Sequence, residues 1–107
     1  MTPEKWGPAL WEEFHRYAFE YSPDKADEAR TWYKDFEHRI PCATCVAKYR
    51  FLVEHTMALT PGDLQDADHV LMWSIRLHNR VNVLLGKPET DEMEALTILR
   101  NKFDLPM

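Results

Sequence analysis

The sequence has little glycine and little cysteine: its 107 residues include three glycines and two cysteines. So few glycines, with seven prolines, favour helices with sharp ends over strands and hairpins. Two cysteines are too few for the disulfide scaffold of a small secreted protein. No apolar run approaches membrane-spanning length, and the polar first residues do not resemble a signal peptide. We therefore expect no membrane partner, with the cytoplasm as the default compartment.

Basic residues are also scarce relative to acidic ones, and the net charge is −5. No run of lysine or arginine is present, so we expect no nucleic-acid partner. A chain of this length, with 45% hydrophobic residues, is large enough for one core without a structural metal. We expect a single domain over residues 1–107.

Both cysteines lie in the stretch Ile40-Pro41-Cys42-Ala43-Thr44-Cys45. Pro41 suits the start of a helix, and the apolar residues that follow recur at helical spacing: Val46, Tyr49, Leu52 and Val53. Cys42 and Cys45 are then one turn apart, close enough to form a disulfide. The helix dipole favours a thiolate at this end, so at least one thiol should be acidic and reactive. The pattern predicts a redox site.

Three other interpretations of the cysteine pair stay open. His38 and His55 could complete a zinc site, although their spacing fits no common zinc pattern. A thioredoxin-like site would need a preceding strand, and nothing upstream alternates with the period of a strand. Both cysteines could also be small residues of the core.

Three helix starts share one pattern, a hydroxyl N-cap before a proline: Thr2-Pro3, Ser22-Pro23 and Thr60-Pro61. Apolar periodicity then predicts helices over about 3–21, 23–39 and 42–57, a fourth from the Thr60 cap to Gly86, and a last one capped by Thr90. The fold class is all-α, a four-helix bundle plus a short fifth helix.

Gly7 and Pro8 are unusual inside the first helix, because glycine weakens a helix and proline removes one hydrogen bond. Either the regular helix starts only at Pro8, which the residue types favour, or another group approaches the backbone closely at Gly7.

The fourth helix carries polar residues on an apolar stripe formed by Leu71, Ile75, His78, Asn82 and Leu85, with Asn79 beside it. Such side chains can bond to neighbouring helices. Three together also suit the edges of a heterocycle, and the nearby cations Arg76, Arg80 and Lys87 could hold a phosphate. A flavin combines these features and would accept electrons from a CxxC pair. Trp11 and Trp73 could pack against its rings, and His15 could bond to it.

Two segments resemble one known family. The CxxC at the head of a helix is followed by His78-Asn79-Arg80-Val81-Asn82-Val83-Leu84-Leu85-Gly86-Lys87-Pro88, and the chain opens with Trp6-Gly7-Pro8-Ala9-Leu10-Trp11-Glu12-Glu13-Phe14-His15. Both are similar to the Erv/ALR family of FAD-linked sulfhydryl oxidases. The resemblance spans Trp6 to Pro88, and the small size, with only the core cysteine pair, is similar to the minimal viral members of the family.

The resemblance implies a helical bundle that holds FAD non-covalently at its mouth and often forms a homodimer through its first two helices. Cys45 would be the sulfur in charge-transfer contact with the flavin, and Cys42 the one that meets the substrate thiol. The positions matching FAD-contacting residues of the family are Gly7, Trp11, His15, Trp73, His78, Asn79, Val81, Asn82 and Lys87, with Tyr21 and Tyr49 as weaker candidates.

The function that follows from the resemblance is thiol oxidation, in which electrons pass through the cysteine pair to FAD and then to oxygen, giving hydrogen peroxide. Many members carry a second cysteine pair on a flexible tail, which this sequence lacks. The substrate would then be a thiol-bearing protein or a small dithiol relay protein. A competing hypothesis is a non-enzymatic helical interaction module with a structural or zinc-binding CxxC.

Overall fold

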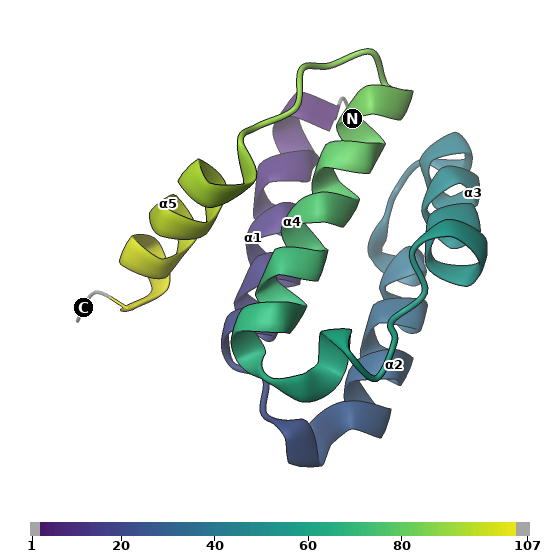
Figure 1. The fold of residues 1–107 in the computed structure, drawn as a ribbon. Coiled ribbons are helices and arrows are strands. Elements are labelled where there is room, and N and C mark those ends of the chain that lie inside the picture. The colour runs from purple at the N-terminus through teal and green to yellow at the C-terminus, as the bar shows by residue number, and fades with distance from the viewer. Residues whose placement is uncertain (1–2, 105–107) are drawn as a thin grey trace.

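The computed structural model describes residues 3–104, and this part of the chain contains helices and no strand (Figure 1). The five α-helices are α1 (Pro3–Phe19), α2 (Ala26–Asp35), α3 (Ala43–Phe51), α4 (Ala67–Leu84) and α5 (Glu92–Asp104). Four short helical turns join them: η1 (Pro23–Lys25), η2 (Phe36–Arg39), η3 (Leu52–Thr56) and η4 (Asp63–Gln65). The all-α fold class is confirmed. Within residues 3–104, no helix has the length and apolar character needed to cross a membrane.

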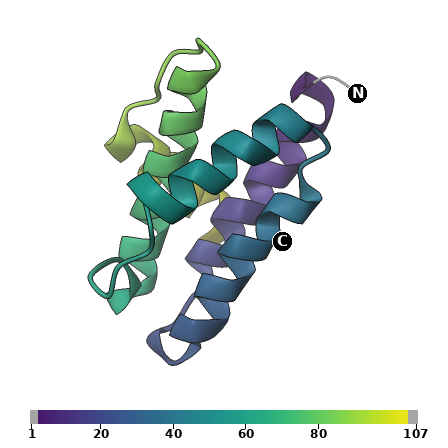
Figure 2. The same cartoon turned by 90° about the vertical axis from the view of Figure 1, so that its right-hand side faces the viewer.

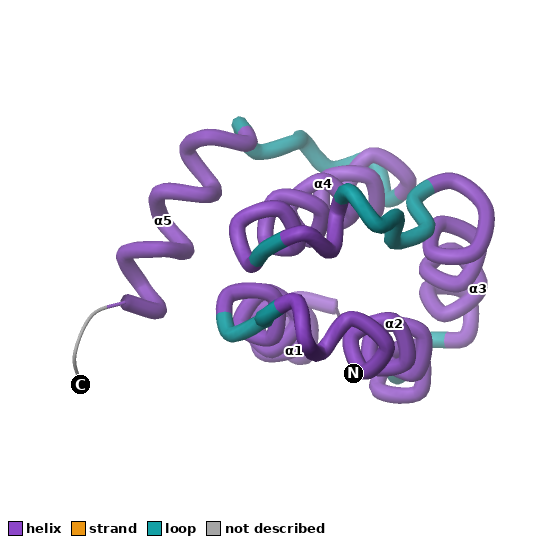
Figure 3. Tube along the Cα trace, turned by 60° about the horizontal axis from the view of Figure 1, so that its bottom comes forward, coloured by secondary structure: helices purple, strands orange, loops and turns teal. Residues whose placement is uncertain are grey.

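The first four α-helices form a bundle, and α5 lies outside it. Figure 3 shows α1, α2, α3 and α4 around a common centre, with α5 beside α1 and α4. Seen from the side in Figure 2, the connection from α2 to α3 lies close to the start of α1. This arrangement brings the cysteine stretch, the first turns of α1 and the last turns of α4 to one end of the bundle.

Aromatic side chains fill the centre of the bundle around Phe14, which is fully buried. Edge-to-face contacts join its ring to Tyr33 at 4.8 Å and to Phe36 at 5.0 Å. The ring centres of Tyr49 and Trp73 lie 6.1 and 5.9 Å from it. These four partners come from α2, η2, α3 and α4, so one side chain of α1 contacts all the other parts of the bundle.

The expectation that the first helix begins late, at Pro8, is wrong. Helix α1 already begins at Pro3 and continues through Gly7 and Pro8. Pro8 is exposed and removes only one backbone hydrogen bond, close to the N-terminal end of the helix. Packing of the later turns can offset the loss of this bond. The expected Thr2 cap lies outside the described residues.

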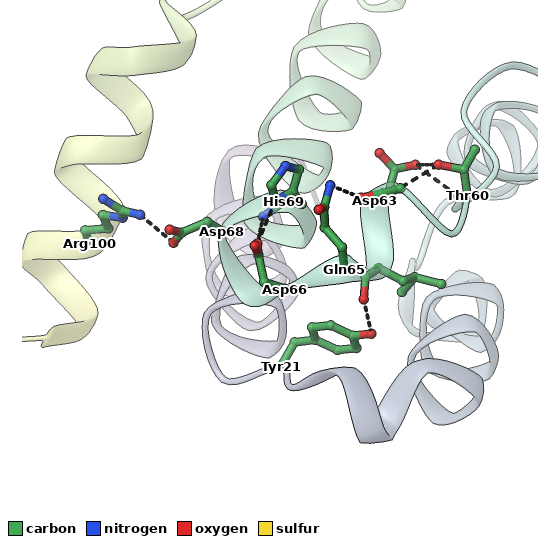
Figure 4. A network of polar contacts seen from close by, with 10 residues as sticks. Tyr21, Thr60, Asp63, Gln65, Asp66, Asp68, His69 and Arg100 are labelled. Carbon is green, nitrogen blue, oxygen red and sulfur yellow. Dashed lines mark hydrogen bonds and ion pairs between the residues drawn. The ribbon is translucent and has the colours of Figure 1, made fainter.

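The expected start of the fourth helix at Thr60 is also wrong. The Thr60 hydroxyl and amide bond to Asp63, and this pairing begins only the short turn η4. Asp66 is extended and is the N-cap of α4, because its carboxylate accepts the amide proton of His69 at 2.9 Å (Figure 4). The hydroxyl of Tyr21, labelled in the same figure, donates to the Leu64 carbonyl at 2.7 Å, which ties η4 to the end of α1.

The two middle helices follow their predicted positions with modified ends. The second starts as η1 after Ser22, whose side chain makes no capping bond to the backbone, and it finishes as η2. The third begins directly after Cys42 and ends in the π-helical turn η3, in which the Met57 amide donates to the Leu52 carbonyl. This turn leaves the Met57 carbonyl free to accept from the Trp73 indole at 2.8 Å.

Helix α5 is capped by Asp91 and not, as expected, by Thr90. The Asp91 carboxylate accepts the Glu94 amide proton at 2.9 Å. Both backbone groups of Thr90 are instead bonded to the Asn79 side-chain amide, at 2.8 and 2.9 Å. An ion pair between Arg100 and Asp68 further holds α5 against α4 (Figure 4).

The two candidate caps give a direct stability test. Asp91→Ala should lower the free energy of unfolding by about 1 kcal/mol, because it leaves the Glu94 amide without its acceptor. Thr90→Ala should lower it much less, since the bonds to Asn79 use the Thr90 backbone. Denaturant unfolding of both variants measures the difference. A larger loss for Thr90→Ala would contradict the assignment.

Candidate redox site

The two cysteines lie at the start of α3 and have different structural roles. Cys42 is the N-cap residue, and its sulfur accepts the Cys45 amide proton at 3.3 Å. Cys45 lies inside the first turn. Both side chains are half-buried, and their sulfur atoms are 2.6 Å apart. A disulfide, at about 2.05 Å, therefore requires only a small further approach.

The surroundings of the two sulfurs shift the thiol pKa values in opposite directions. The pKa of Cys42 is lowered by the hydrogen bond from the Cys45 thiol, then by the backbone amides of Cys45 and Thr44, with Lys48 adding positive charge. The pKa of Cys45 is raised, first by burial and then by its bond to Cys42. Of the reduced pair, Cys42 thus ionises before Cys45 and is the better nucleophile.

A cavity of about 520 Å³ opens beside Cys45, at the end of the bundle where α1 begins and α4 ends. Its volume lies in the range of ligand pockets, roughly 300–1,000 Å³. Its walls are mainly apolar and include few polar groups. The lining residues are Gly7, Pro8, Leu10, Trp11, Phe36, Ile40, Cys45, Tyr49, His78, Val81, Asn82, Leu85 and Lys87.

Two stacked ring side chains, Trp11 and His78, line this cavity. The Trp11 and His78 rings are stacked, with centres 3.7 Å apart and planes 11° apart. Behind them, His15 Nε2 lies 3.2 Å from His78 Nδ1, and His15 Nδ1 lies 2.9 Å from the Ser74 hydroxyl. Burial lowers the pKa of His15 to about 3 and that of His78 to about 4, so both rings are neutral.

The end of α4 brings Asn82 and Lys87 to the cavity. Gly86 has a φ of +73°, a left-handed conformation that glycine adopts readily. The Gly86 amide bonds to the Val83 carbonyl at 3.1 Å and the Lys87 amide to the Asn82 carbonyl at 2.7 Å, which together form a Schellman motif. The motif reverses the chain, so Lys87 lines the cavity together with Asn82.

The structure gathers many, but not all, of the predicted site residues at this cavity. Seven of the eleven predicted cofactor contacts line it: Gly7, Trp11, Tyr49, His78, Val81, Asn82 and Lys87. Of the two cysteines, Cys45 lines it and Cys42 does not.

The other four predicted contacts are bonded within the protein. His15 lies behind His78, and the Tyr21 hydroxyl is used by Leu64 at the opposite end of the bundle. Trp73 is buried in the aromatic core, and Asn79 holds Thr90.

Sequence reasoning missed several cavity-lining residues: Pro8, Leu10, Phe36, Ile40 and Leu85. Four of them are apolar residues within or beside predicted helices, and periodicity alone does not separate a helix face that packs from one that lines a cavity. Ser74 was also missed; its only signal is its position one turn before His78.

The zinc hypothesis finds no ligand set in the part of the chain that the structure describes. No three histidine, cysteine, aspartate or glutamate side chains gather there closely enough to hold a metal ion. His38 and His55 therefore do not join the cysteine pair.

The opposite pKa shifts predict different reactivities in the reduced protein. Cys42 should be alkylated by iodoacetamide before Cys45, because its thiolate forms at lower pH. Cys45→Ala should move the alkylation of Cys42 to higher pH, since it removes the largest stabilising hydrogen bond. Rates against pH, with the modified cysteine identified by mass spectrometry, measure both effects.

Lys48→Ala is the matched control and should shift the Cys42 profile less than Cys45→Ala. Preferential alkylation of Cys45 in the unsubstituted chain would contradict the assignment.

Comparisons with known proteins point to one family. A protein of Invertebrate iridescent virus 6, named a "putative FAD-linked sulfhydryl oxidase", is 29% identical over 102 residues, which cover 89% of this chain and 92% of the relative. A protein of Acanthamoeba polyphaga mimivirus, named a "probable FAD-linked sulfhydryl oxidase", is 30% identical over 102 residues, covering 90% of this chain and 69% of the relative. No solved structure matches. The family profile described as Erv1/Alr matches residues 8–103, and the chain therefore belongs to the Erv1/Alr family.

Proposed function

We propose that this chain is an FAD-dependent thiol oxidase that forms disulfides in thiol-bearing substrates. The observation that carries the proposal is the placement of Cys45 on the wall of the cavity, with Cys42 in contact with it and outside the cavity. Electrons that enter at Cys42 can leave through Cys45 on the cavity side. The names of the two viral relatives and the family membership support the same activity.

The cavity residues fit a flavin nucleotide. Apart from its chain neighbours and the backbone of its own helix, nothing lies within 4 Å of the position that a Cβ atom would take at Gly7, so bare backbone faces this part of the cavity. Apolar side chains suit the faces of a flat ring, His78 and Asn82 offer bonds to its edges, and Lys87 offers a cation for a phosphate. When bound, FAD supplies a two-electron acceptor that oxygen can reoxidise, giving hydrogen peroxide.

The cysteine pair performs the thiol chemistry. A substrate thiolate attacks the Cys42 sulfur of the Cys42–Cys45 disulfide; a substrate–Cys42 bond forms, and Cys45 leaves as a thiolate on the cavity wall. A second substrate thiolate then attacks the substrate sulfur and releases Cys42. Two substrate thiols are oxidised to a disulfide, the cysteine pair is reduced by two electrons, and the two thiol protons pass to solvent.

The capping geometry makes Cys42 a good leaving group in the second step. As Cys42 leaves, the amides of Cys45 and Thr44 stabilise its thiolate, which corresponds to a lower pKa. A thiol of lower pKa leaves faster in disulfide exchange. The site therefore favours release of the finished disulfide from Cys42.

The substrate of Cys42 is a small or flexible dithiol, and a relay protein is the class that we favour. Cys42 and Cys45 are the only cysteines of the printed sequence, so the substrate has to meet Cys42 directly. The Cys42 side chain is half-buried at the end of a helix, which hinders a thiol held rigidly on a large folded protein.

The cofactor assignment predicts that purified protein contains one non-covalent FAD per chain, released on denaturation. Val81→Trp should lose most of it, because the indole fills the lined cavity. Val83→Trp, on the same helix but exposed and outside this lining, should retain it. Chromatography of the denatured supernatant measures the content. Absence of flavin, FMN in its place, or equal loss in both variants would contradict the assignment.

The two cysteine roles predict which variant captures the partner. Cys45→Ser cannot resolve a mixed disulfide at Cys42 from within and should accumulate the natural partner in a lysate of the native host. Cys42→Ser is the matched control and should capture much less. Non-reducing electrophoresis with mass spectrometry identifies the captured species. A broad set of large proteins would favour direct oxidation over a relay.

A further inference from the structure

Three side chains form a hydrogen-bonded row from the core of the bundle to the cavity. The row starts at the Leu71 carbonyl, which lies 2.7 Å from the Ser74 hydroxyl. It continues through Ser74 and His15 and ends at His78, with the 2.9 and 3.2 Å contacts already described. His15 and Ser74 are buried, and only His78 lines the cavity.

The chemistry of each group determines the direction of every bond in this row. A carbonyl only accepts, so the single proton of the Ser74 hydroxyl goes to Leu71. Ser74 therefore accepts from His15, whose Nδ1 carries the proton. A neutral imidazole has one N–H, so His15 Nε2 is an acceptor and His78 Nδ1 must donate to it. The second nitrogen of His78, Nε2, is left without a proton.

Neutrality of both rings is consistent with their surroundings. Burial is the largest cause of the low pKa of each, and the positive charge of Lys87 lowers the pKa of His78 further. His15 also lies near His78 and Lys102, which lower its pKa after burial.

His78 Nε2 is available to a ligand. It has no hydrogen-bond partner, and among the described residues no side-chain nitrogen or oxygen is buried without one, so this atom remains accessible. Trp11, stacked on the imidazole, and His15, bonded to Nδ1, hold the ring in its plane. An oriented, unprotonated nitrogen thus faces a mainly apolar cavity, where a hydrogen bond is stronger than in water.

We infer that Ser74 and His15 are positioning residues that fix the tautomer of His78, so that its Nε2 accepts a hydrogen bond from an N–H or O–H donor of the bound flavin nucleotide. The inference rests on the proposed function for the identity of this ligand. The imide N–H of the flavin ring and the hydroxyls of its sugar chains are donors of this kind. The opposite tautomer would present an N–H to the same donor and repel it.

The tautomers can be measured directly by ¹⁵N NMR of the histidine rings, in the FAD-loaded chain and after removal of FAD. His15 and His78 should both show a protonated Nδ1 and an unprotonated Nε2. Signals are assigned with His15→Gln and His78→Gln. A protonated Nε2 on His78 in the unsubstituted chain would overturn the inference, whatever the variants show.

The positioning role of Ser74 is tested by Ser74→Ala, which frees His15 to reverse its bonds. His78 should then gain the tautomer with a protonated Nε2, and FAD should bind roughly three- to tenfold more weakly, the effect of one hydrogen bond. Thr97→Ala is the matched control, because it also removes a hydroxyl bonded to its own helix, but on α5. An unchanged His78 tautomer in Ser74→Ala, or an equal change in Thr97→Ala, would overturn the inference.

If Ser74→Ala fails to fold, a second variant tests whether the row fixes the tautomer of His78. His15→Phe removes the acceptor of His78 Nδ1 and should also give a protonated Nε2 on His78. FAD that carries a methyl group on the imide nitrogen separates the two possible donors. If the imide is the donor, the methylated FAD should bind more weakly than ordinary FAD to the unsubstituted chain, but not to the variant. If a hydroxyl is the donor, the methylated and ordinary FAD should bind the unsubstituted chain equally well. Failure to find flavin would instead overturn the proposed function, while the ring tautomers remain measurable.

Discussion

The packing of Phe14 is the constraint on which the rest of the structure depends. Its ring contacts Tyr33, Phe36, Tyr49 and Trp73, and so joins α1 to every other part of the bundle. Each such aromatic pair contributes about 0.5–1.5 kcal/mol beyond the burial of its area. Hydrogen bonds fix the cluster further, because the Tyr33 hydroxyl donates to the Phe14 carbonyl and the Tyr49 hydroxyl to the Tyr33 carbonyl. Tyr49 lies one turn after Cys45, and this network therefore also determines where α3 presents its cysteines.

The polar residues of α4 divide into two groups because successive residues of a helix point in directions about 100° apart. His78 faces α1 and the cavity. Asn79, the next residue, points away from them and uses its side-chain amide to hold the backbone of Thr90. One residue thus contributes to the site, and its neighbour fixes the chain that leads to α5. Both are polar in a largely apolar helix, but for different physical reasons.

The sequence predicts the helices, and the residues that gather at one end of the bundle, better than it predicts the hydrogen-bond partners of individual side chains. Apolar periodicity and the Gly86-Lys87-Pro88 stop suffice for α4, since both depend on local chain geometry. Local rules fail at Thr60 and Thr90, because Asp66 and Asp91 are the actual caps of α4 and α5. The backbone of Thr90 is instead held by Asn79, a residue of the preceding helix. The same limit applies to Tyr21, whose partner is 43 residues away in sequence. Nothing in the local pattern indicates such a partner.

The asymmetry of the cysteine pair follows from helix capping alone. Of two residues three positions apart at the start of a helix, only the first can be the N-cap, and its side chain turns back to accept the amide proton of the second. The first sulfur therefore receives hydrogen bonds at the helix end, which lower its pKa, while the second is carried into the bundle, where burial raises its pKa. Under the proposed function, a cavity beside the second sulfur then gives the electrons a single direction. The cavity bounded by Gly7, His78 and Lys87 lies at this position.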